Sequence, residues 1–534
     1  MNGAQILIQT LADREVDVCF TNPGTSEMHI VAALDDVPKM RAVLCLYEGV
    51  ASGAADGYGR MAGKPGCTLL HLGPGLANAL ANFHNARRAR TPVVNVVGDH
   101  ALSHKRLDTP LESDIDALAG TVSGWTRRTY RSADVASDAT QAVAKASGPP
   151  GRIATLIVPA DVSWSDAVKP SPPNVPALMR AAARGMSPEA VAVAAEALRS
   201  GEPAALLLGG AAEHGPAMRA AARIAGATGA KLYCQSFPAR LERGAGRPPV
   251  KRLPYFPSDV AAELAGLRHL VLADAADPAP FFAYPGLSSR LAPDGCAVSR
   301  LADETEDVTA ALEALADEVC TLAKKPVTAL AQEAGRPTRP TGALTAESVA
   351  SAIGALLPEN SIVVDETNTS GIWLAAATAG CPPHDWLTLT GGSMGQGLPT
   401  AVGAAMACPD RPVFALEGDG SAMYTLQALW TMAREGLNVT TVLFDNGAYA
   451  ILDLELQTAA GPEGGRRGHE LIDISRPALD FLALARGLGV PAQRVRTAEE
   501  FTAALEHSLM EPGPMLIDCA VPSVASAART PGVQ

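Results

Sequence analysis

Two stretches in the last third of the chain, VFALEGDGS at residues 413–421 and TTVLFDNGAY at residues 440–449, decide the fold class. Each is an apolar run with the composition of a buried β-strand, and each ends in a polar turn that contains glycine. A helical pattern lies between them, so the segment is predicted to form one βαβ unit. Such a unit places the two turns at neighbouring strand ends, which is where α/β sheets bind ligands.

Short apolar runs alternate with helical patterns along the rest of the chain as well. Strands that alternate with helices indicate parallel sheets covered by helices on both faces. We therefore predict an α/β fold built from three doubly wound parallel-sheet domains. The further candidate strands cover residues 16–20, 41–46, 67–72, 92–98, 204–210, 269–275 and 361–366.

Two stretches rich in proline and glycine, residues 165–187 and 333–341, are typical of linkers between domains. Cutting the 534-residue chain there leaves segments of ordinary domain size. We expect the domains to cover residues 1–165, 186–330 and 342–527.

Charge and cysteine content narrow the function classes. The formal net charge of -13 argues against nucleic acid or an anionic membrane as the main partner, because phosphate binding needs clustered Lys and Arg. The nine cysteines form no C-x-x-C pair, which is typical of buried thiols in a reducing compartment. The N-terminus lacks the cationic start of a signal peptide, and no run reaches the roughly 18 apolar residues of a membrane span. We expect a soluble cytoplasmic protein.

Oxygen donors gather in the two quoted turns. Asp419 offers a carboxylate, Asn446 an amide oxygen and Ala448 a main-chain carbonyl, and hard oxygen donors of this kind suit Mg²⁺. The alternative is a pair of ordinary strand-end turns, because Asp-Gly and Asn-Gly favour turns on their own. Their joint spacing within one βαβ unit favours a Mg²⁺ site that takes its remaining ligands from phosphate and water.

The glycines of the first turn point to a phosphate ligand. Gly418 and Gly420 would let the backbone approach a diphosphate closely, and Ser421 is predicted to begin a helix whose N–H groups face it. Taken together, G-D-G and the later Asn-containing turn resemble the signature of thiamine-diphosphate-dependent enzymes. One departure is Asp445, which stands where these enzymes usually have the first of two Asn residues. The resemblance implies thiamine diphosphate and Mg²⁺ as cofactors.

Glu48 follows the apolar run 41–46 and opens a helical segment, EGVASGAADGYGR, that resembles the pyrimidine-binding segment of the same enzymes. The resemblance implies that this carboxylate lies beside the aminopyrimidine ring and relays the proton that activates the cofactor. The alternative is a merely favourable helix N-terminus, since the helix dipole stabilises a carboxylate there. The diphosphate motif elsewhere in the chain favours the catalytic role.

The stretch GGSMGQGLP at residues 391–399 matches the family pattern between these elements. The resemblance implies that the Gly392 carbonyl accepts a hydrogen bond from the cofactor's amino group and that Met394 is the apolar fulcrum that bends the cofactor. Core packing is the alternative for Met394. Three residues at the end of the strand 361–366 are expected to line the diphosphate or the substrate entrance: Glu366, Thr367 and Asn368.

The resemblance extends almost end to end, over a pyrimidine-binding, a middle and a diphosphate-binding domain. It is to the family of acetolactate synthase, pyruvate decarboxylase, pyruvate oxidase and benzoylformate decarboxylase. In this family Glu48 and the G-D-G turn would come from different subunits. The resemblance therefore implies a homodimer or homotetramer with active sites between subunits.

Within the family, the pattern is most similar to benzoylformate decarboxylase. N-P-G-T-S-E at residues 22–27 resembles its N-P-G-S-N-E, which makes Thr25 a candidate for binding the substrate carboxylate. L-H-L-G-P-G at residues 70–75 places His71 where that enzyme has a catalytic histidine. An imidazole there could shuttle protons near physiological pH. A capping or core histidine is the alternative.

The match to benzoylformate decarboxylase departs in the middle domain. That enzyme carries a second catalytic histidine there, whereas the corresponding stretch APFFAYPG has none and offers Phe281, Phe282 and Tyr284. His100 and His104 could substitute for it, but histidines in a loop are expected to face solvent. The departure bears on the substrate and leaves the thiamine chemistry as predicted.

Acetolactate synthase is the alternative within the family. That enzyme has a loop with Phe and Gln before an acidic residue, and this chain has Leu111, Glu112 and Ser113 there instead. Its Gln-Trp-Gln element is also altered, to Asp453, Leu454 and Glu455. The Gly-rich turn LLLGGAAEHG at residues 206–215 is too weak a pattern to predict FAD.

The sequence thus predicts a non-oxidative decarboxylase that converts a 2-oxo acid with a bulky acyl group to an aldehyde, with carboligation to 2-hydroxy ketones as a further activity. Tyr449, Ile451 and Leu452 would shape the acyl pocket, with plain helix packing as their alternative. A noncatalytic cofactor-binding paralogue is the hypothesis from another class, and the presence of Glu48 argues against it.

Overall fold

The computed structural model describes residues 1–167, 183–321, 327–460 and 465–523. Most of the predicted linker 165–187, and the predicted end of the last domain at residue 527, lie outside the described residues. The chain separates into two compact units. Unit 1 comprises Met1–Ala181, Pro337–Thr378 and Gly391–Gln534, and unit 2 comprises Ala182–Arg336 and Ala379–Thr390. The three domain boundaries taken from the sequence stay a prediction.

The first sheet of unit 1 has six parallel strands in the order β2-β1-β3-β4-β6-β5. Alternate residues of its central strands, such as Val94 and Val96, pack against helices α1 and α6 in one buried core. The strands are β1 (Val18–Asn22), β2 (Arg41–Leu44), β3 (Gly66–Leu70), β4 (Val93–Asp99), β5 (Trp125–Arg128) and β6 (Ile153–Pro159). The helices are α1 (Gly3–Asp13), α2 (Met28–Leu34), α3 (Glu48–Ala62), α4 (Leu72–Arg88), α5 (Ile115–Gly120), α6 (Val135–Ser147) and α7 (Ala160–Trp164).

The second sheet, in unit 2, is also parallel and has the order β10-β8-β7-β11-β12. Both of its faces are buried: Leu206 and Leu208 face one core, while Ala205 and Leu207 face the other. Its strands are β7 (Ala204–Leu208), β8 (Lys231–Cys234), β10 (Lys251–Arg252), β11 (His269–Ala273) and β12 (Ala297–Ala302), and its helices are α8 (Pro188–Arg199), α9 (Gly215–Thr228), α10 (Pro257–Leu264) and α11 (Val308–Thr321). Unit 2 also contains β9 (Leu241–Arg243) and β14 (His384–Thr388), which pair antiparallel.

The third sheet contributes five parallel strands to unit 1, in the order β17-β18-β16-β15-β13. They are β13 (Ile362–Glu366), β15 (Val413–Gly418), β16 (Val439–Asp445), β17 (Ala492–Val495) and β18 (Met515–Ala520). The helices are α12 (Ala346–Leu356), α13 (Leu374–Ala377), α14 (Gly397–Ala407), α15 (Asp419–Ala422), α16 (Ala428–Glu435), α17 (Ala450–Ala460), α18 (Arg466–Ile472), α19 (Phe481–Gly487) and α20 (Ala498–Met510). The predicted α/β fold with three mainly parallel sheets is confirmed, and the antiparallel pair of β9 and β14 is the departure from it.

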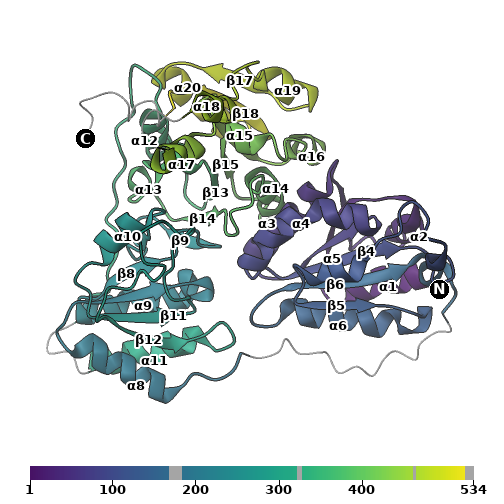
Figure 1. The fold of residues 1–534 in the computed structure, drawn as a ribbon, viewed down its shortest axis with the longest axis horizontal. Coiled ribbons are helices and arrows are strands. Elements are labelled where there is room, and N and C mark those ends of the chain that lie inside the picture. The colour runs from purple at the N-terminus through teal and green to yellow at the C-terminus, as the bar shows by residue number, and fades with distance from the viewer. Residues whose placement is uncertain (168–182, 322–326, 461–464, 524–534) are drawn as a thin grey trace. The chain divides into compact units, whose positions relative to one another are not determined.

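Helices α3 and α14 pack closely and join the first and third sheets within unit 1 (Figure 1). Their glycines explain how close they come, because a Cβ at Gly57 would lie 2.1 Å from the carbonyl oxygen of Thr400. A Cβ at Gly403 would lie 1.9 Å from the carbonyl oxygen of Ala54 in the same way. Small residues of the segment EGVASGAADGYGR therefore serve helix packing.

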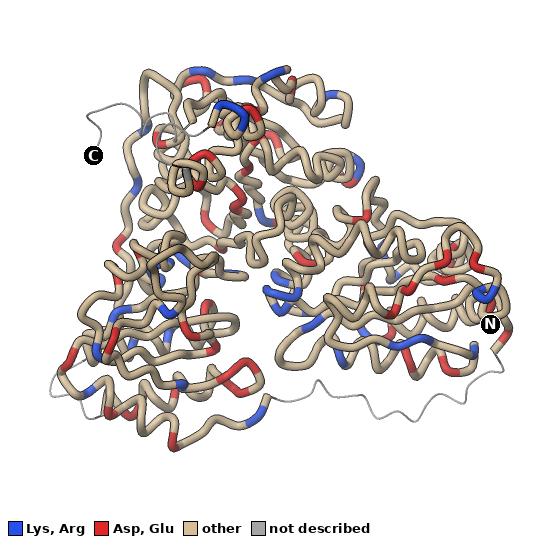
Figure 2. The backbone as a smooth tube through the Cα atoms, in the orientation of Figure 1, with Lys and Arg blue, Asp and Glu red and all other residues tan. Residues whose placement is uncertain are grey.

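The described part of the chain carries charges of both signs and free thiols. Figure 2 shows Lys and Arg interspersed with Asp and Glu along the described chain. All nine cysteines are free, and seven of them are buried. Within the described residues, every helix is too short or too polar to cross a membrane.

Candidate active site

The two turns that were predicted to lie side by side do so in the structure. Strands β15 and β16 are parallel neighbours in which Gly418 pairs with Phe444. The main-chain N–H groups of Asn446 and Gly447 donate to Oδ2 of Asp419, at 3.0 and 2.6 Å. Asp419 is 2% exposed, so its carboxylate is held by the backbone of the neighbouring turn.

The donor set of these turns fits a hard cation. Asn446 accepts a hydrogen bond from Ala448 N at its Oδ1 (3.0 Å) and donates from Nδ2 to Ser370 (3.3 Å), which fixes its amide orientation. The described residues contain no group of three or more His, Cys, Asp or Glu side chains that could hold a metal ion. The turns themselves offer one carboxylate, one amide oxygen and one carbonyl, hard oxygen donors of the kind that Mg²⁺ accepts when phosphate and water supply its other ligands.

The electrostatics of the turn favour a bound cation. Burial raises the pKa of Asp419 to about 6, although the N–H groups of Gly447 and Gly420 oppose the rise. A cation beside this carboxylate would compensate for the lost solvation. Asp445, the residue that departs from the family pattern, pairs with Arg494 at 2.5 Å. The Arg494 guanidinium therefore places a positive charge next to the Asp445 carboxylate.

The residues predicted at the diphosphate surround the start of α15. The helix begins at Asp419 rather than at Ser421 as predicted, because Gly418 is already its N-cap, and it is four residues long. The ring of Tyr449 covers Gly420 so closely that a Cβ there would lie 2.4 Å from it. Ser421 accepts a hydrogen bond from Asn368 Nδ2 at 3.3 Å, and Asn368 has the positive φ of 50°.

Glu366 lies under the loop at residues 391–397. Its carboxylate accepts hydrogen bonds from Gly395 N (2.7 Å) and Gly397 N (2.5 Å), and burial raises its pKa to about 7. Burial and the charge of Glu366 raise the pKa of the neighbouring Glu417 well above its ordinary range. Glu366 therefore shapes the loop that carries Met394, and its neighbour Thr367 is buried with its hydroxyl on Asp365 (2.7 Å).

The loop itself requires an unusual backbone. Gly392 and Gly395 have φ values of 72° and 87°, a region that side chains with a Cβ rarely adopt. The Gly395 carbonyl accepts from Thr425 Oγ1 at 3.0 Å, so the loop is also held from the third sheet. Met394 between these glycines is half-buried.

Glu48 is the first residue of α3 and is 8% exposed. Its Oε2 accepts a hydrogen bond of 3.0 Å from Nδ2 of Asn78 on α4. The other oxygen lies 3.4 Å from the position of a Cβ at Gly75, which shows how closely α4 approaches this carboxylate. Asn78 was missed at the sequence level, because a single Asn in a helix carries no signal of its own.

His71 is the N-cap residue of α4 and is held by Glu27. The distance from His71 Nδ1 to Glu27 Oε2 is 2.8 Å, and Glu27 also accepts from Gly24 N (2.9 Å) and Ser26 Oγ (2.5 Å). Ser26 Oγ lies 3.2 Å from the same nitrogen, so Glu27 and Ser26 both hold the Nδ1 side of the ring, and a proton on Nδ1 would satisfy the contact with a carboxylate and leave Nε2 free of it. Glu27 is fully buried, whereas the His71 side chain is 22% exposed.

Glu27 was missed although it ends the quoted motif N-P-G-T-S-E. The acidic residue was the available signal, but only the fold shows that it contacts a histidine in a different motif. Thr25 lies in the same short 3₁₀ turn, Thr25–Glu27, and is exposed. A Cβ at Gly24 would lie 2.2 Å from the His71 ring, so this turn and the ring are in direct contact.

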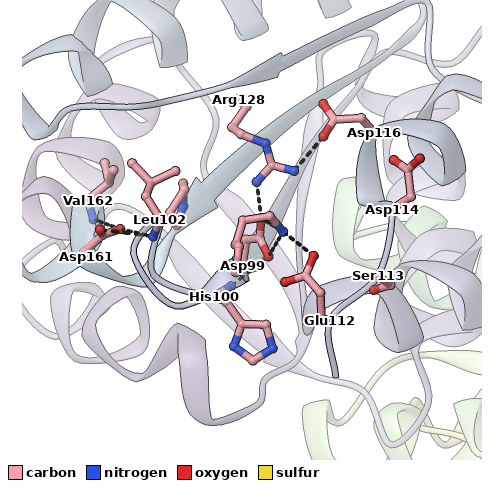
Figure 3. A network of polar contacts seen from close by, with 12 residues as sticks. Asp99, His100, Leu102, Glu112, Ser113, Asp114, Asp116, Arg128, Asp161 and Val162 are labelled. Carbon is pink, nitrogen blue, oxygen red and sulfur yellow. Dashed lines mark hydrogen bonds and ion pairs between the residues drawn. The ribbon is translucent and has the colours of Figure 1, made fainter. Parts of the chain in front are cut away.

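An ion-pair network follows β4, in the segment that was compared with acetolactate synthase. Figure 3 shows Asp99 accepting from Arg128, which also donates to Asp116 at 2.6 Å. Lys105 bridges Asp99 (3.0 Å) and Glu112 (2.6 Å). An open pocket of about 380 Å³ is lined by the partners of Asp99 in this network, Lys105 and Arg128, and by Glu112 and Asp116.

The same segment packs against the turn that carries His71. A Cβ at Gly73 would lie 1.9 Å from the Ser113 hydroxyl. His100 is half-buried and contacts the exposed His104, with ring centroids 5.4 Å apart, and bonds Thr109 through Nε2 (3.3 Å).

The residues proposed for the acyl pocket differ in exposure. Ile451 on α17 is half-buried and Leu452 is 48% exposed. Asp453, in the altered synthase element, pairs with His469 at 3.1 Å. In unit 2, Phe281 and Phe282 are exposed and belong to a cluster of aromatic rings that also contains Phe237, Tyr255 and Phe256.

Comparison with known families assigns both ends of the chain. Residues 1–119 match the model of the N-terminal TPP binding domain of thiamine pyrophosphate enzymes, and residues 367–519 match that of their C-terminal TPP binding domain. The two matched segments contain the Glu48 and His71 region and the Asp419 and Asn446 turns, respectively.

Individual relatives cover nearly the whole chain. A protein of Mycobacterium tuberculosis named "Putative acetolactate synthase large subunit IlvX" is 60% identical over 98% of this chain and 100% of its own length. Benzoylformate decarboxylase of Pseudomonas aeruginosa is 30% identical over 93% of this chain and 95% of its own length. A similar solved structure is that of a thiamine diphosphate-dependent 4-hydroxybenzoylformate decarboxylase of Rhodococcus jostii RHA1, with a TM-score of 0.86 and 25% sequence identity. The match covers 98% of this chain and 100% of that chain.

Proposed function

Because the chain belongs to the thiamine pyrophosphate enzyme family, we propose that it decarboxylates a bulky 2-oxo acid without oxidation and releases an aldehyde. The observation that carries this proposal is the contact between Glu27 and His71, which provides an oriented and partly exposed imidazole at the carboxyl end of β3. The names of the Pseudomonas and Rhodococcus relatives support an aromatic 2-oxo acid as the substrate class.

The metal site is proposed at the paired turns. Asp419, the amide oxygen of Asn446 and the Ala448 carbonyl would hold Mg²⁺ against the diphosphate. The buried, backbone-held carboxylate with its raised pKa supports this role. The remaining proposed cofactor contacts are Glu366, Thr367, Asn368, Gly392, Met394, Gly418, Gly420, Ser421, Tyr449 and Ile451.

When bound, thiamine diphosphate supplies the electron sink that allows loss of carbon dioxide. The chain's own residues then have three proposed tasks. Glu48, oriented by Asn78, holds and returns a proton at its carboxylate beside the aminopyrimidine ring. His71 moves a proton through Nε2, because its Nδ1 is committed to Glu27. The Thr25 hydroxyl donates a hydrogen bond to the substrate carboxylate.

The proposed assembly is a homodimer or homotetramer with the active sites between subunits. In this arrangement Glu48 of one subunit would serve the cofactor held by the metal-binding turns of another. Light scattering during gel filtration tests it, and a monomer that is fully active at assay concentration would contradict it.

A second candidate function is an acetolactate synthase-like condensation, in which a second 2-oxo acid takes the place of the proton. The name of the Mycobacterium relative favours it. Carboligation to 2-hydroxy ketones would use the same groups, since only the final acceptor differs.

The test is the release of carbon dioxide in the presence of thiamine diphosphate and Mg²⁺ from pyruvate, branched-chain 2-oxo acids, phenylpyruvate and benzoylformate, with identification of each product. An aldehyde from one bulky acid is the expected result. Acetolactate from pyruvate would replace the proposal with the second candidate. Cofactor binding without any turnover would indicate the noncatalytic paralogue.

A further inference from the structure

Helix α4 carries a row of asparagines that the proposed mechanism uses only in part. Asn78, Asn82 and Asn85 are spaced by four and three residues, which places them on one face of the helix. Asn78 contacts Glu48, as described above. Asn82 and Asn85 are 1% and 0% exposed, and buried amides are costly unless they are hydrogen-bonded.

Asn82 links two segments that are far apart in the sequence. Its Nδ2 donates to the carbonyl of Gly49 at 2.8 Å and to the carbonyl of Gly395 at 3.1 Å. Gly49 follows Glu48, and Gly395 follows Met394. One amide nitrogen therefore joins the start of α3 to the loop that carries Met394.

Asn85 holds the other side of Met394. Its Oδ1 accepts from Ser393 N at 3.1 Å, and its Nδ2 donates to Ser393 O at 2.7 Å. A main-chain N–H must donate and a carbonyl must accept, so this two-point contact fixes the orientation of the amide. Asn85 Nδ2 also donates to Asn82 Oδ1 at 3.0 Å, which couples the two side chains.

The start of the loop approaches the same helix. His84 Nε2 lies 3.2 Å from the carbonyl oxygen of Gly391. A Cβ at Gly391 would lie 2.5 Å from Asn85 Oδ1, so a larger residue there would displace the Asn85 amide. The loop is thus fixed to α4 on both sides of Met394.

We propose that Asn82 and Asn85 are positioning residues that hold the loop at residues 391–397, and with it Met394, in place against helix α4 of the same chain. Helix α4 is the rigid element to which the loop is fixed. The inference rests on the proposed cofactor contact of Met394, and it holds whichever subunit supplies Glu48 to that cofactor. Neither asparagine takes part in proton transfer.

Two variants and one matched control test this role. Asn82→Asp keeps the volume but turns a carboxylate toward two carbonyls, and Asn85→Ser removes the two-point contact with Ser393. The control is Asn95→Ser, because Asn95 is equally buried but its hydrogen bonds join Thr68 and Thr155, both at 2.9 Å, within the first sheet. Each purified full-length protein is titrated with thiamine diphosphate at saturating Mg²⁺ by calorimetry, and its unfolding temperature is measured alongside.

Both loop variants are expected to bind the cofactor about tenfold more weakly than the native chain, because Asn82→Asp sets a carboxylate against two carbonyl oxygens and Asn85→Ser removes both hydrogen bonds to Ser393. Deuterium exchange at the reactive carbon of the bound cofactor is expected to slow to a similar extent. Asn95→Ser is expected to lower the unfolding temperature and to leave cofactor affinity unchanged. If Asn82→Asp does not fold, Asn85→Ser decides, because it removes the contact with the loop without adding a charge.

Unchanged affinity and exchange in the loop variants would overturn the inference, as would an equal loss of affinity in Asn95→Ser. A different result would contradict the proposed function. A native chain that binds thiamine diphosphate but releases carbon dioxide from no 2-oxo acid contradicts the decarboxylase and leaves the positioning role intact.

Discussion

Two regions of unit 1 hold their polar groups by opposite means. At the start of α3 and α4, side chains hold side chains: Glu27 contacts His71, and Asn78 contacts Glu48. At the ends of β15 and β16, the backbone holds the side chain, because Asp419 accepts from three main-chain N–H groups, those of Gly420, Asn446 and Gly447.

The difference matches what each region is proposed to do. A group that transfers protons must keep one tautomer and one orientation, and a specific partner side chain provides both. A carboxylate that binds a metal ion needs a fixed place, and a local turn provides that. In the first region, we therefore expect turnover to fall when a partner residue from another segment is replaced. In the second region, we expect cofactor binding to fall when a metal-binding residue itself is replaced.

The largest effect is expected from Glu48→Gln, which keeps the shape of the side chain but removes the proton-carrying group. Turnover should fall by about 100- to 10,000-fold, while calorimetry shows nearly native binding of thiamine diphosphate. Glu435→Gln is the control, since Glu435 pairs with Arg41 in the same unit, at 2.6 Å. Native turnover in Glu48→Gln would remove the first region from the chemistry.

A smaller effect is expected from Glu27→Gln, which leaves a hydrogen-bond acceptor beside His71 but removes the charge that fixes its tautomer. Turnover should fall by about 10- to 100-fold, because partners that orient a functional group typically contribute that much. Cofactor affinity should not change. A loss of affinity in proportion to the loss of turnover would show that Glu27 only supports the fold, and the contrast between the two regions would disappear.

The smallest effect concerns stability in the second region, where Glu417 lies buried beside Glu366. Burial and then Glu366 raise the pKa of Glu417 well above its ordinary value of 4.5. A carboxyl group with a raised pKa stabilises the fold below its ordinary pKa, and this contribution is lost as the pH rises through the folded value.

Glu417→Gln should therefore raise the free energy of unfolding at pH 8 by about 1–3 kcal/mol, and change it little at pH 5. Urea unfolding of the cofactor-free protein at both pH values measures this. An equal gain at both pH values would assign the effect to packing rather than to charge.

The contrast between the regions also explains what the sequence could predict. Asp419 and Asn446 are held by the turns in which they lie, so a local pattern and the geometry of a βαβ unit were enough to place them together. The α/β fold and most strand positions followed from the same kind of local pattern. The partners of His71 and Glu48 lie in other segments, and no periodicity links Glu27 to His71 or Asn78 to Glu48.

Two details of the second region also depended on tertiary structure. Helix α15 begins two residues earlier than predicted, because Gly418 is its N-cap. The carboxylate of Glu366 turns under the loop, where Gly395 and Gly397 donate to it, and only the folded backbone reveals this.

The most direct test of the division between the regions is to measure turnover against cofactor concentration for His71→Ala and Asp419→Asn in one assay. The account predicts that Asp419→Asn needs about 10- to 100-fold more thiamine diphosphate with Mg²⁺ and regains turnover as the cofactor is raised, whereas His71→Ala binds normally and stays slow at every concentration. Recovery of His71→Ala at high cofactor concentration, or an Asp419→Asn variant that binds normally and stays slow, would contradict it.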